Sequence, residues 1–134
     1  HNHTRSSLKT AEAAHIPTDR LAKAVMLEDD KGYLMAVVPA SYRVNLGELR
    51  QQLGRNIGLA TESELTEIFK DCELGAIPPL GLAYGIETLY DDSLTQMSDI
   101  YFEAGDHEEL IHVTREEFMR LMGMARHGKF CHLS

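Results

Sequence analysis

Three groups of residues in this sequence have types and spacings that could support chemistry on a bound molecule. The first is a lysine within an apolar run, because Lys23 lies in LAKAVML between Ala22 and Ala24. On a strand, alternate side chains point the same way, so Lys23 shares a side with Val25 and Leu27. Such a lysine either extends its charged end to water at the strand end or faces a polar pocket. The pattern leaves both interpretations open.

The second group is the stretch GAIPPLG at residues 75–81. Its two prolines, Pro78 and Pro79, fix their own φ and restrict the residue before them, so the loop is stiff. Glycines at its ends let another molecule approach the backbone closely. Backbone N–H donors remain at Gly75, Ala76, Ile77, Leu80 and Gly81. Donors held in this way suit an oxyanion or a nucleotide sugar, but a stiff connection with Gly75 as a helix cap explains the same composition.

The third group is Gly105-Asp106-His107, which follows a predicted strand. A histidine at a strand end can orient a substrate or carry a proton, because its ordinary pKa lies near neutrality. A plain hairpin turn, in which Asp106 bonds its own backbone, accounts for the same three residues.

Other residue patterns argue against several function classes. The seven histidines and the two cysteines show no metal-ligand spacing, and the sequence has no phosphate-binding glycine loop and no serine nucleophile motif. We therefore predict no metal and no cofactor. We interpret Cys72 and Cys131 as reduced thiols of a cytoplasmic protein. No apolar run is long enough to span a membrane, and the net charge of −8 argues against extensive contact with DNA or another phosphate backbone.

The elements that must position these groups follow from apolar periodicity and from turn and cap residues. Strands at 21–27 and 33–38, joined by the turn DDKG, form a hairpin that is apolar on both sides and hence central. Two capping boxes, Thr61 with Glu64 and Thr114 with Glu117, begin helices. The full set comprises helices at 8–14, 46–53 (ended by Gly54), 62 to about 70 and 115 to about 122, further strands at 57–60, 84–90, 100–104 and 110–113, and a turn at DDS.

This order of elements predicts a single α+β domain with a mixed, largely antiparallel sheet flanked by helices. A chain of 134 residues is long enough for one core and too short for two comfortable ones. We place the domain at residues 1–122 and expect residues 123–134 to form a loosely held C-terminal tail.

Five stretches, taken in order, resemble the YbaK/EbsC family, whose domain is also the editing insertion of bacterial prolyl-tRNA synthetases. They are HNHTRSS, LAKAVML, YLMAVVPASYRVNL, GAIPPLG, and YFEAGDHEELIHV leading into TREEFMRLM. The resemblance extends from residue 1 to about residue 122. Because no synthetase segment is present, the chain is similar to a free-standing member.

The resemblance implies a metal-independent deacylase that hydrolyses mischarged aminoacyl-tRNA in trans, with a small amino acid, on a proline tRNA, as the expected substrate. The partners implied are the acceptor end of the tRNA and an aminoacyl-tRNA synthetase. The family pattern assigns catalysis to Lys23, Gly81 and His107. The substrate-binding residues implied are Gly75, Ala76, Ile77, Pro78, Pro79, Leu80, Gly105 and Asp106. One departure concerns Ala24, since the family often has a polar residue after the lysine, and a hydroxyl or amide contact from this position is lost here.

The mechanism expected from these residues is attack of water on the ester carbonyl. The loop N–H groups stabilise the oxyanion, Lys23 offsets negative charge, and a substrate hydroxyl positions the water. This hypothesis requires Lys23 and the loop to face one cavity. The alternative is a non-catalytic module that binds an aminoacyl-adenosine-like ligand or a protein partner.

Overall fold

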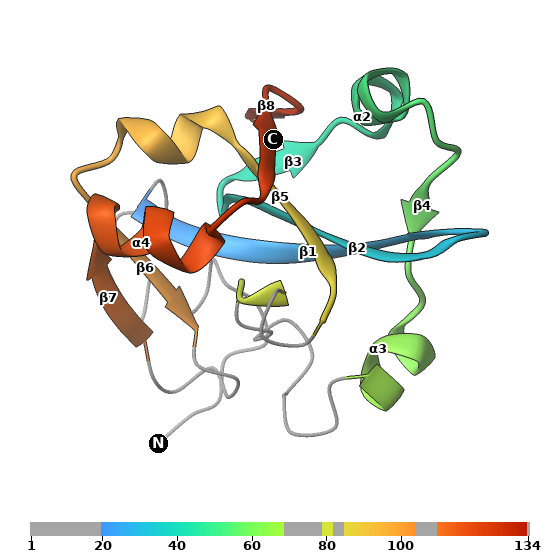
Figure 1. The fold of residues 1–134 in the computed structure, drawn as a ribbon, viewed down its shortest axis with the longest axis horizontal. Coiled ribbons are helices and arrows are strands. Elements are labelled where there is room, and N and C mark those ends of the chain that lie inside the picture. Colours follow the sequence, from blue (N-terminus) through green and yellow to red (C-terminus); the bar gives the residue numbers. More distant parts are fainter. Residues whose placement is uncertain (1–19, 69–78, 82–84, 104–109, 134) are drawn as a thin grey trace.

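The computed structural model describes residues 20–68, 79–81, 85–103 and 110–133. The elements follow one another along the chain as β1 (Leu21–Asp29), β2 (Gly32–Pro39), β3 (Tyr42–Val44), α2 (Leu46–Leu53), β4 (Gly58–Leu59), α3 (Glu62–Ile68), β5 (Glu87–Asp91), the 3₁₀ helix η3 (Asp92–Gln96), β6 (Asp99–Glu103), β7 (Leu110–Thr114), α4 (Arg115–Met122), β8 (Arg126–Gly128) and β9 (Cys131–Leu133) (Figure 1). The helix predicted at residues 8–14 lies outside the described residues.

The β1–β2 hairpin is the centre of the sheet, as predicted. The strand order is β7-β6-β1-β2-β5-β8, and β4 also pairs with β1. A turn at Asp30 and Lys31 joins the two strands, and Asp29 Oδ1 accepts a hydrogen bond from the Lys31 amide over 2.9 Å. The next residue, Gly32, has a φ of 138°, which favours glycine.

The predicted single α+β domain with a mixed sheet is confirmed. Parallel pairing joins β1 to β6, β2 to β5 and β5 to β8. Antiparallel pairing joins β1 to β2, β1 to β4, β6 to β7, and β3 to β9. Antiparallel pairs are thus only a small majority of the pairs in the described chain.

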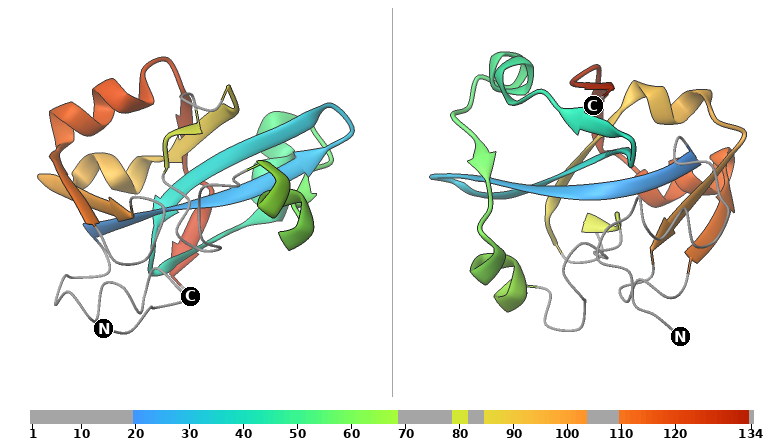
Figure 2. Two further views of the ribbon diagram at one scale, coloured as in Figure 1. Left: turned by 90° about the horizontal axis from the view of Figure 1, so that it is seen from below. Right: turned by 180° about the vertical axis from the view of Figure 1, so that it is seen from behind.

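The sheet carries an apolar core on each side. We call one side the Met35 face, where buried side chains pack with Phe118 and Met122 of α4. The other is the Val38 face, where buried side chains pack with Leu49 of α2. Figure 2 shows α2 and α3 on opposite sides of the hairpin. Buried strand residues on the Met35 face are Ala22, Met26, Met35, Val37, Tyr90 and Ile100, and those on the Val38 face are Leu27, Leu34, Ala36, Val38 and Leu89.

The predicted helix caps are confirmed. Gly54 ends α2 with a φ of 64°, in the left-handed region. At the start of α3, the Thr61 amide donates to Glu64 Oε1 over 3.1 Å, and the Glu64 amide donates to Thr61 Oγ1 over 3.3 Å. The capping box of Thr114 begins α4 in the same way.

The C-terminal segment is held more firmly than the sequence predicted. Its β8 pairs with β5, its β9 pairs with β3, and Phe130 between them is 1% exposed. Asp91 Oδ2 accepts hydrogen bonds from the amides of Phe130 over 2.8 Å and Cys131 over 3.1 Å. The expectation of a loosely held tail was wrong because these strands are too short to show periodicity and their anchor is distant in sequence. Similarly, the predicted turn at DDS forms part of η3, and β3 was not predicted.

Candidate functional site

Lys23 lies on β1 opposite Val38 of β2, so its side chain belongs to the Val38 face. It is half-buried. Burial, followed by the nearby positive charge of Arg43, lowers the pKa of Lys23. The ammonium group is therefore not simply extended into water at the strand end.

Arg43 of β3 is the charged group with the largest effect on the pKa of Lys23. Its side chain is exposed, and neither cation forms an ion pair with a described residue. Two positive groups that repel one another attract an anion, such as a phosphate or a developing oxyanion. This pair was not predictable from the sequence, because only the folded chain brings Arg43 of β3 close to Lys23 of β1.

Cys131, which lies close to Lys23, and its neighbour Asp91 are poorly suited to catalysis. Burial and the neighbouring Asp91 raise the pKa of the Cys131 thiol to about 12, so it stays protonated and weakly nucleophilic near neutrality. For Asp91, burial acts to raise the pKa, but hydrogen bonds from the Phe130 and Ser93 amides outweigh it and lower the pKa. Both residues line a cavity of ≈290 Å³ with Tyr42, Asp92, Ser93, Gln96 and Lys129.

The described end of the predicted loop, residues 79–81, lies on the Met35 face. A Cβ at Gly81 would collide with Thr88 Oγ1 and would lie 3.2 Å from Met35 Cβ and Sδ. The Gly81 carbonyl accepts a hydrogen bond from the Ile86 amide over 2.8 Å. Close packing against the sheet therefore explains this glycine without any ligand.

Lys23 and Gly81 are consequently on opposite sides of the sheet. The sheet backbone separates them, so the described residues do not bring the lysine and the end of the loop into one cavity. Ala24, which departs from the family pattern, packs against the core on the Met35 face, on the side of Gly81. The other predicted site residues, Gly75, Ala76, Ile77, Pro78, Gly105, Asp106 and His107, lie outside the described residues.

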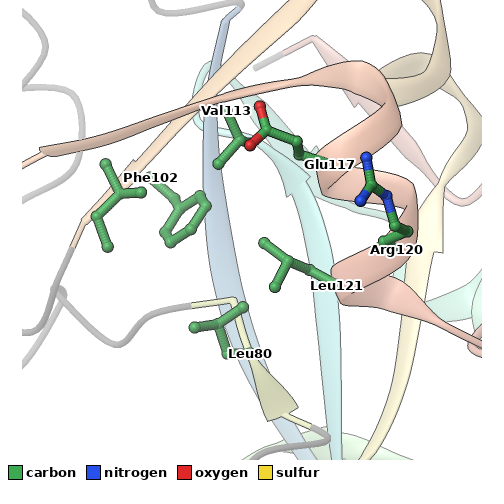
Figure 3. Close-up of a pocket in the computed structure, with 7 residues that line it drawn as sticks. Leu80, Phe102, Val113, Glu117, Arg120 and Leu121 are labelled. Carbon is green, nitrogen blue, oxygen red and sulfur yellow. The ribbon is translucent and has the colours of Figure 1, made fainter.

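A larger cavity of ≈450 Å³ lies beside the end of the loop, and Figure 3 shows it between Leu80, β6, β7 and α4. Its lining is mainly apolar and consists of Leu80, Phe102, Ile111, Val113, Leu121, Glu117 and Arg120. Glu117 Oε1 accepts a hydrogen bond from the Thr114 amide over 2.9 Å, so this carboxylate is occupied in capping α4. The cavity suits an apolar group rather than acid–base chemistry.

Within the described ranges, no cluster of three or more histidine, cysteine, aspartate or glutamate side chains is placed to hold a metal ion. Among the same residues, no helix has both the length and the apolar character needed to cross a membrane.

Comparison with known proteins gives a family and a fold. The profile of the family described as "Aminoacyl-tRNA editing domain" matches residues 1–121. No curated protein matches the sequence. A solved structure of a "hypothetical protein" has a TM-score of 0.84 and 21% identity, with coverage of 98% of this chain and 87% of that chain.

Two further solved structures share the fold. One, described as a "putative trans-editing enzyme for prolyl tRNA synthetase", has a TM-score of 0.83 and 22% identity, with coverage of 96% of this chain and 81% of that chain. The other is described as a "Putative signal transduction protein" from Marinobacter aquaeolei VT8. It has a TM-score of 0.80 and 24% identity, and the match covers 87% of this chain but 26% of that longer chain.

Proposed function

The chain belongs to the aminoacyl-tRNA editing domain family, and we propose that it hydrolyses the ester bond of mischarged aminoacyl-tRNA in trans. The proposed substrate is a small amino acid on a proline tRNA, in line with the description of one structural relative. The observation that carries the proposal is the family match over residues 1–121. The half-buried lysine that the family pattern assigns to catalysis supports it.

In the proposed reaction, water attacks the ester carbonyl, and the carbonyl oxygen becomes an oxyanion. The ribose oxygen then leaves and takes up a proton, which yields free amino acid and uncharged tRNA. Lys23, with Arg43 beside it, supplies positive charge for the oxyanion or for the terminal phosphate. The proposed oxyanion contacts are the backbone donors at Gly75, Ala76 and Ile77, and the proposal requires these residues, unlike Gly81, to lie on the side of Lys23.

The other family residues keep proposed roles in this reaction. Gly105, Asp106 and His107 are proposed contacts to the substrate beside Lys23. The packing of Gly81 against Thr88 supports a positioning role, in which it fixes the end of the loop, in place of direct catalysis. Pro78 and Pro79 are proposed to stiffen the same loop, and Leu80, which lines the apolar cavity, is a proposed substrate contact.

Deacylation of a panel of proline tRNAs esterified with alanine, serine or cysteine tests the proposal. We expect wild-type protein to release amino acid with turnover, and Lys23→Ala to lower kcat by about 10²-fold, the effect of losing one oxyanion contact. Lys31→Ala is the matched control, because Lys31 is exposed at the hairpin turn. Full activity of Lys23→Ala would remove the lysine from its proposed role.

A non-catalytic binding module is the second candidate, and one observation favours it. Lys23 and the end of the loop face opposite sides of the sheet, which is unexpected for two parts of one catalytic centre. In that case each protein molecule protects about one mischarged tRNA, and no amino acid is released above the uncatalysed rate. Release of many amino acids per protein molecule excludes it.

A further inference from the structure

An aromatic stack lies on the same face of the sheet as Lys23. The rings of Tyr101 on β6 and His112 on β7 are nearly parallel, with centroids 4.3 Å apart and an interplanar angle of 8°. Tyr101 pairs with Leu21 of β1, and Lys23 is two residues beyond Leu21, so all of these side chains share the Val38 face.

The His112 ring is held in a fixed orientation with one surface open. One side of the ring covers Tyr101, and Nε2 lies 2.7 Å from Asp99 Oδ2. The side chain of His112 nonetheless remains 51% exposed. A planar ring that is fixed in position and open on one side is the kind of surface on which an unpaired base stacks.

The charge around the stack suits a nucleic-acid end even though the whole protein is acidic. Asp99 is the carboxylate in contact with His112, and its Oδ1 lies 3.4 Å from an Arg20 guanidinium nitrogen. Arg20 is 50% exposed, so part of its side chain is available to a phosphate. Arg20 thus offsets the charge of Asp99 at this place, and His112 contacts the same carboxylate.

The distance between the aromatic stack and Lys23 fits a short segment of single-stranded RNA. The step from β7 to β1 crosses two strand spacings, and Leu21 to Lys23 is a step of two residues. Together these separate the Cα atoms of His112 and Lys23 by roughly 12 Å.

We propose that the Tyr101–His112 stack, with Arg20 beside it, binds an unpaired base of the tRNA 3′ end next to the esterified adenosine. This inference rests on the proposed function, because that function places the terminal adenosine near Lys23. His112 is a substrate-binding residue in this arrangement and takes no part in bond cleavage.

A second histidine provides a matched control. His127 stacks on Tyr90 with centroids 5.4 Å apart, its Nδ1 lies 2.7 Å from Asp92 Oδ1, and its side chain is 59% exposed. It therefore has the same kinds of partner as His112. Tyr90 belongs to the Met35 face, so His127 lies on the other side of the sheet from Lys23.

The binding test uses an RNA oligonucleotide of sequence ACCA that carries no amino acid. A 2-aminopurine at the 3′ end or in place of an interior base serves as the fluorescent probe. We expect wild-type protein to quench the probe, and His112→Ala to raise the Kd about tenfold, which corresponds to about 1.4 kcal/mol of lost stacking. His112→Phe keeps a stacking ring and should bind within about threefold of wild type, and His127→Ala should leave the Kd unchanged. Equal weakening in the two alanine variants, or no quenching by wild-type protein, overturns the inference.

The kinetic test separates this inference from the proposed function. With aminoacyl-tRNA, His112→Ala should raise KM and leave kcat unchanged, whereas with aminoacyl-adenosine, which lacks the preceding nucleotides, neither constant should change. If wild-type protein deacylates tRNA and His112→Ala has the wild-type KM, the stack is not a binding site and the proposed function stands. If no tRNA is deacylated but ACCA binding depends on His112, the proposed function fails and the binding site stands.

Discussion

Among the glycines that the structure describes, Gly81 leaves the least room for a side chain. The family pattern places it in a catalytic loop, but its contacts with Thr88 and Met35 already require a residue without a side chain. A glycine in a motif can thus be needed for packing as well as for access by a ligand. Measurements of stability and activity distinguish the two requirements.

We predict that Gly81→Ala lowers the free energy of unfolding by about 1–3 kcal/mol, because the added methyl group overfills a packed site. Chemical denaturation measures the change. Gly58→Ala is the control, since a Cβ there meets nothing within 4 Å. Thr88→Ala in the Gly81→Ala background should recover part of the loss, since it removes the colliding hydroxyl. Equal stability of Gly81→Ala and Gly58→Ala would contradict the packing argument.

At the scale of elements, the C-terminal segment depends on Asp91 of β5. Its carboxylate accepts hydrogen bonds from the amides of Phe130, Cys131 and Ser93. These bonds tie Phe130 and the start of β9 to the end of β5, and Phe130 completes the covering of the Val38 face. Together with the pairing of β8 to β5 and of β9 to β3, one upstream carboxylate therefore orders a segment without recognisable periodicity.

We predict that Asp91→Ala costs about 3 kcal/mol of stability, because buried N–H groups lose their acceptor. Hydrogen exchange should show lost protection at the Phe130 and Cys131 amides. Asp92→Ala is the control, since Asp92 makes a surface pair with His127, and pairs of this kind contribute about 0–1 kcal/mol. Unchanged protection of Phe130 in Asp91→Ala would show that other contacts hold the segment.

At the scale of the whole molecule, one ion-pair network joins three distant parts of the chain. Arg55 Nε donates to Asp29 Oδ2 over 2.6 Å and a second guanidinium nitrogen donates to Asp29 Oδ1 over 3.0 Å, while a third lies 3.1 Å from Glu87 Oε1. The network therefore links the end of β1, the segment after α2 and the start of β5. The hydrogen bonds from Arg55 lower the pKa of Asp29 to about 2, from an ordinary value of 3.8.

The pH dependence of stability follows from this lowered pKa. Because the folded-state pKa lies below the unfolded value, Asp29 stabilises the fold above pH 3.8, and its contribution is lost as the pH falls toward about 2. We predict that Asp29→Asn is less stable than wild type at pH 7 and that most of the difference is lost when the pH reaches about 2. Unfolding measured across this range checks the prediction, with Asp30→Asn, an exposed turn residue, as the control. A difference as large at pH 2 as at pH 7 would point to lost packing instead of lost charge.

The sequence alone indicates the local elements and, through its resemblance, the family. The β1–β2 hairpin, the Gly54 cap and the capping boxes at Thr61 and Thr114 were predictable, because each depends on residues a few positions apart. Alternation along β1 also showed which side chains accompany Lys23 on one side of the strand. These signals are local, and local signals suffice for helices, turns and strand faces.

The folded structure alone shows what covers each side of the sheet. It placed Arg43 beside Lys23, the end of the loop on the opposite face, His112 over Tyr101, and Phe130 on Asp91. Each of these contacts joins segments that are remote in sequence, and no periodicity of a single strand specifies its neighbours. The physical reason is that strand pairing and crossover connections are non-local, so the composition of a site that spans several strands cannot be read from any one of them.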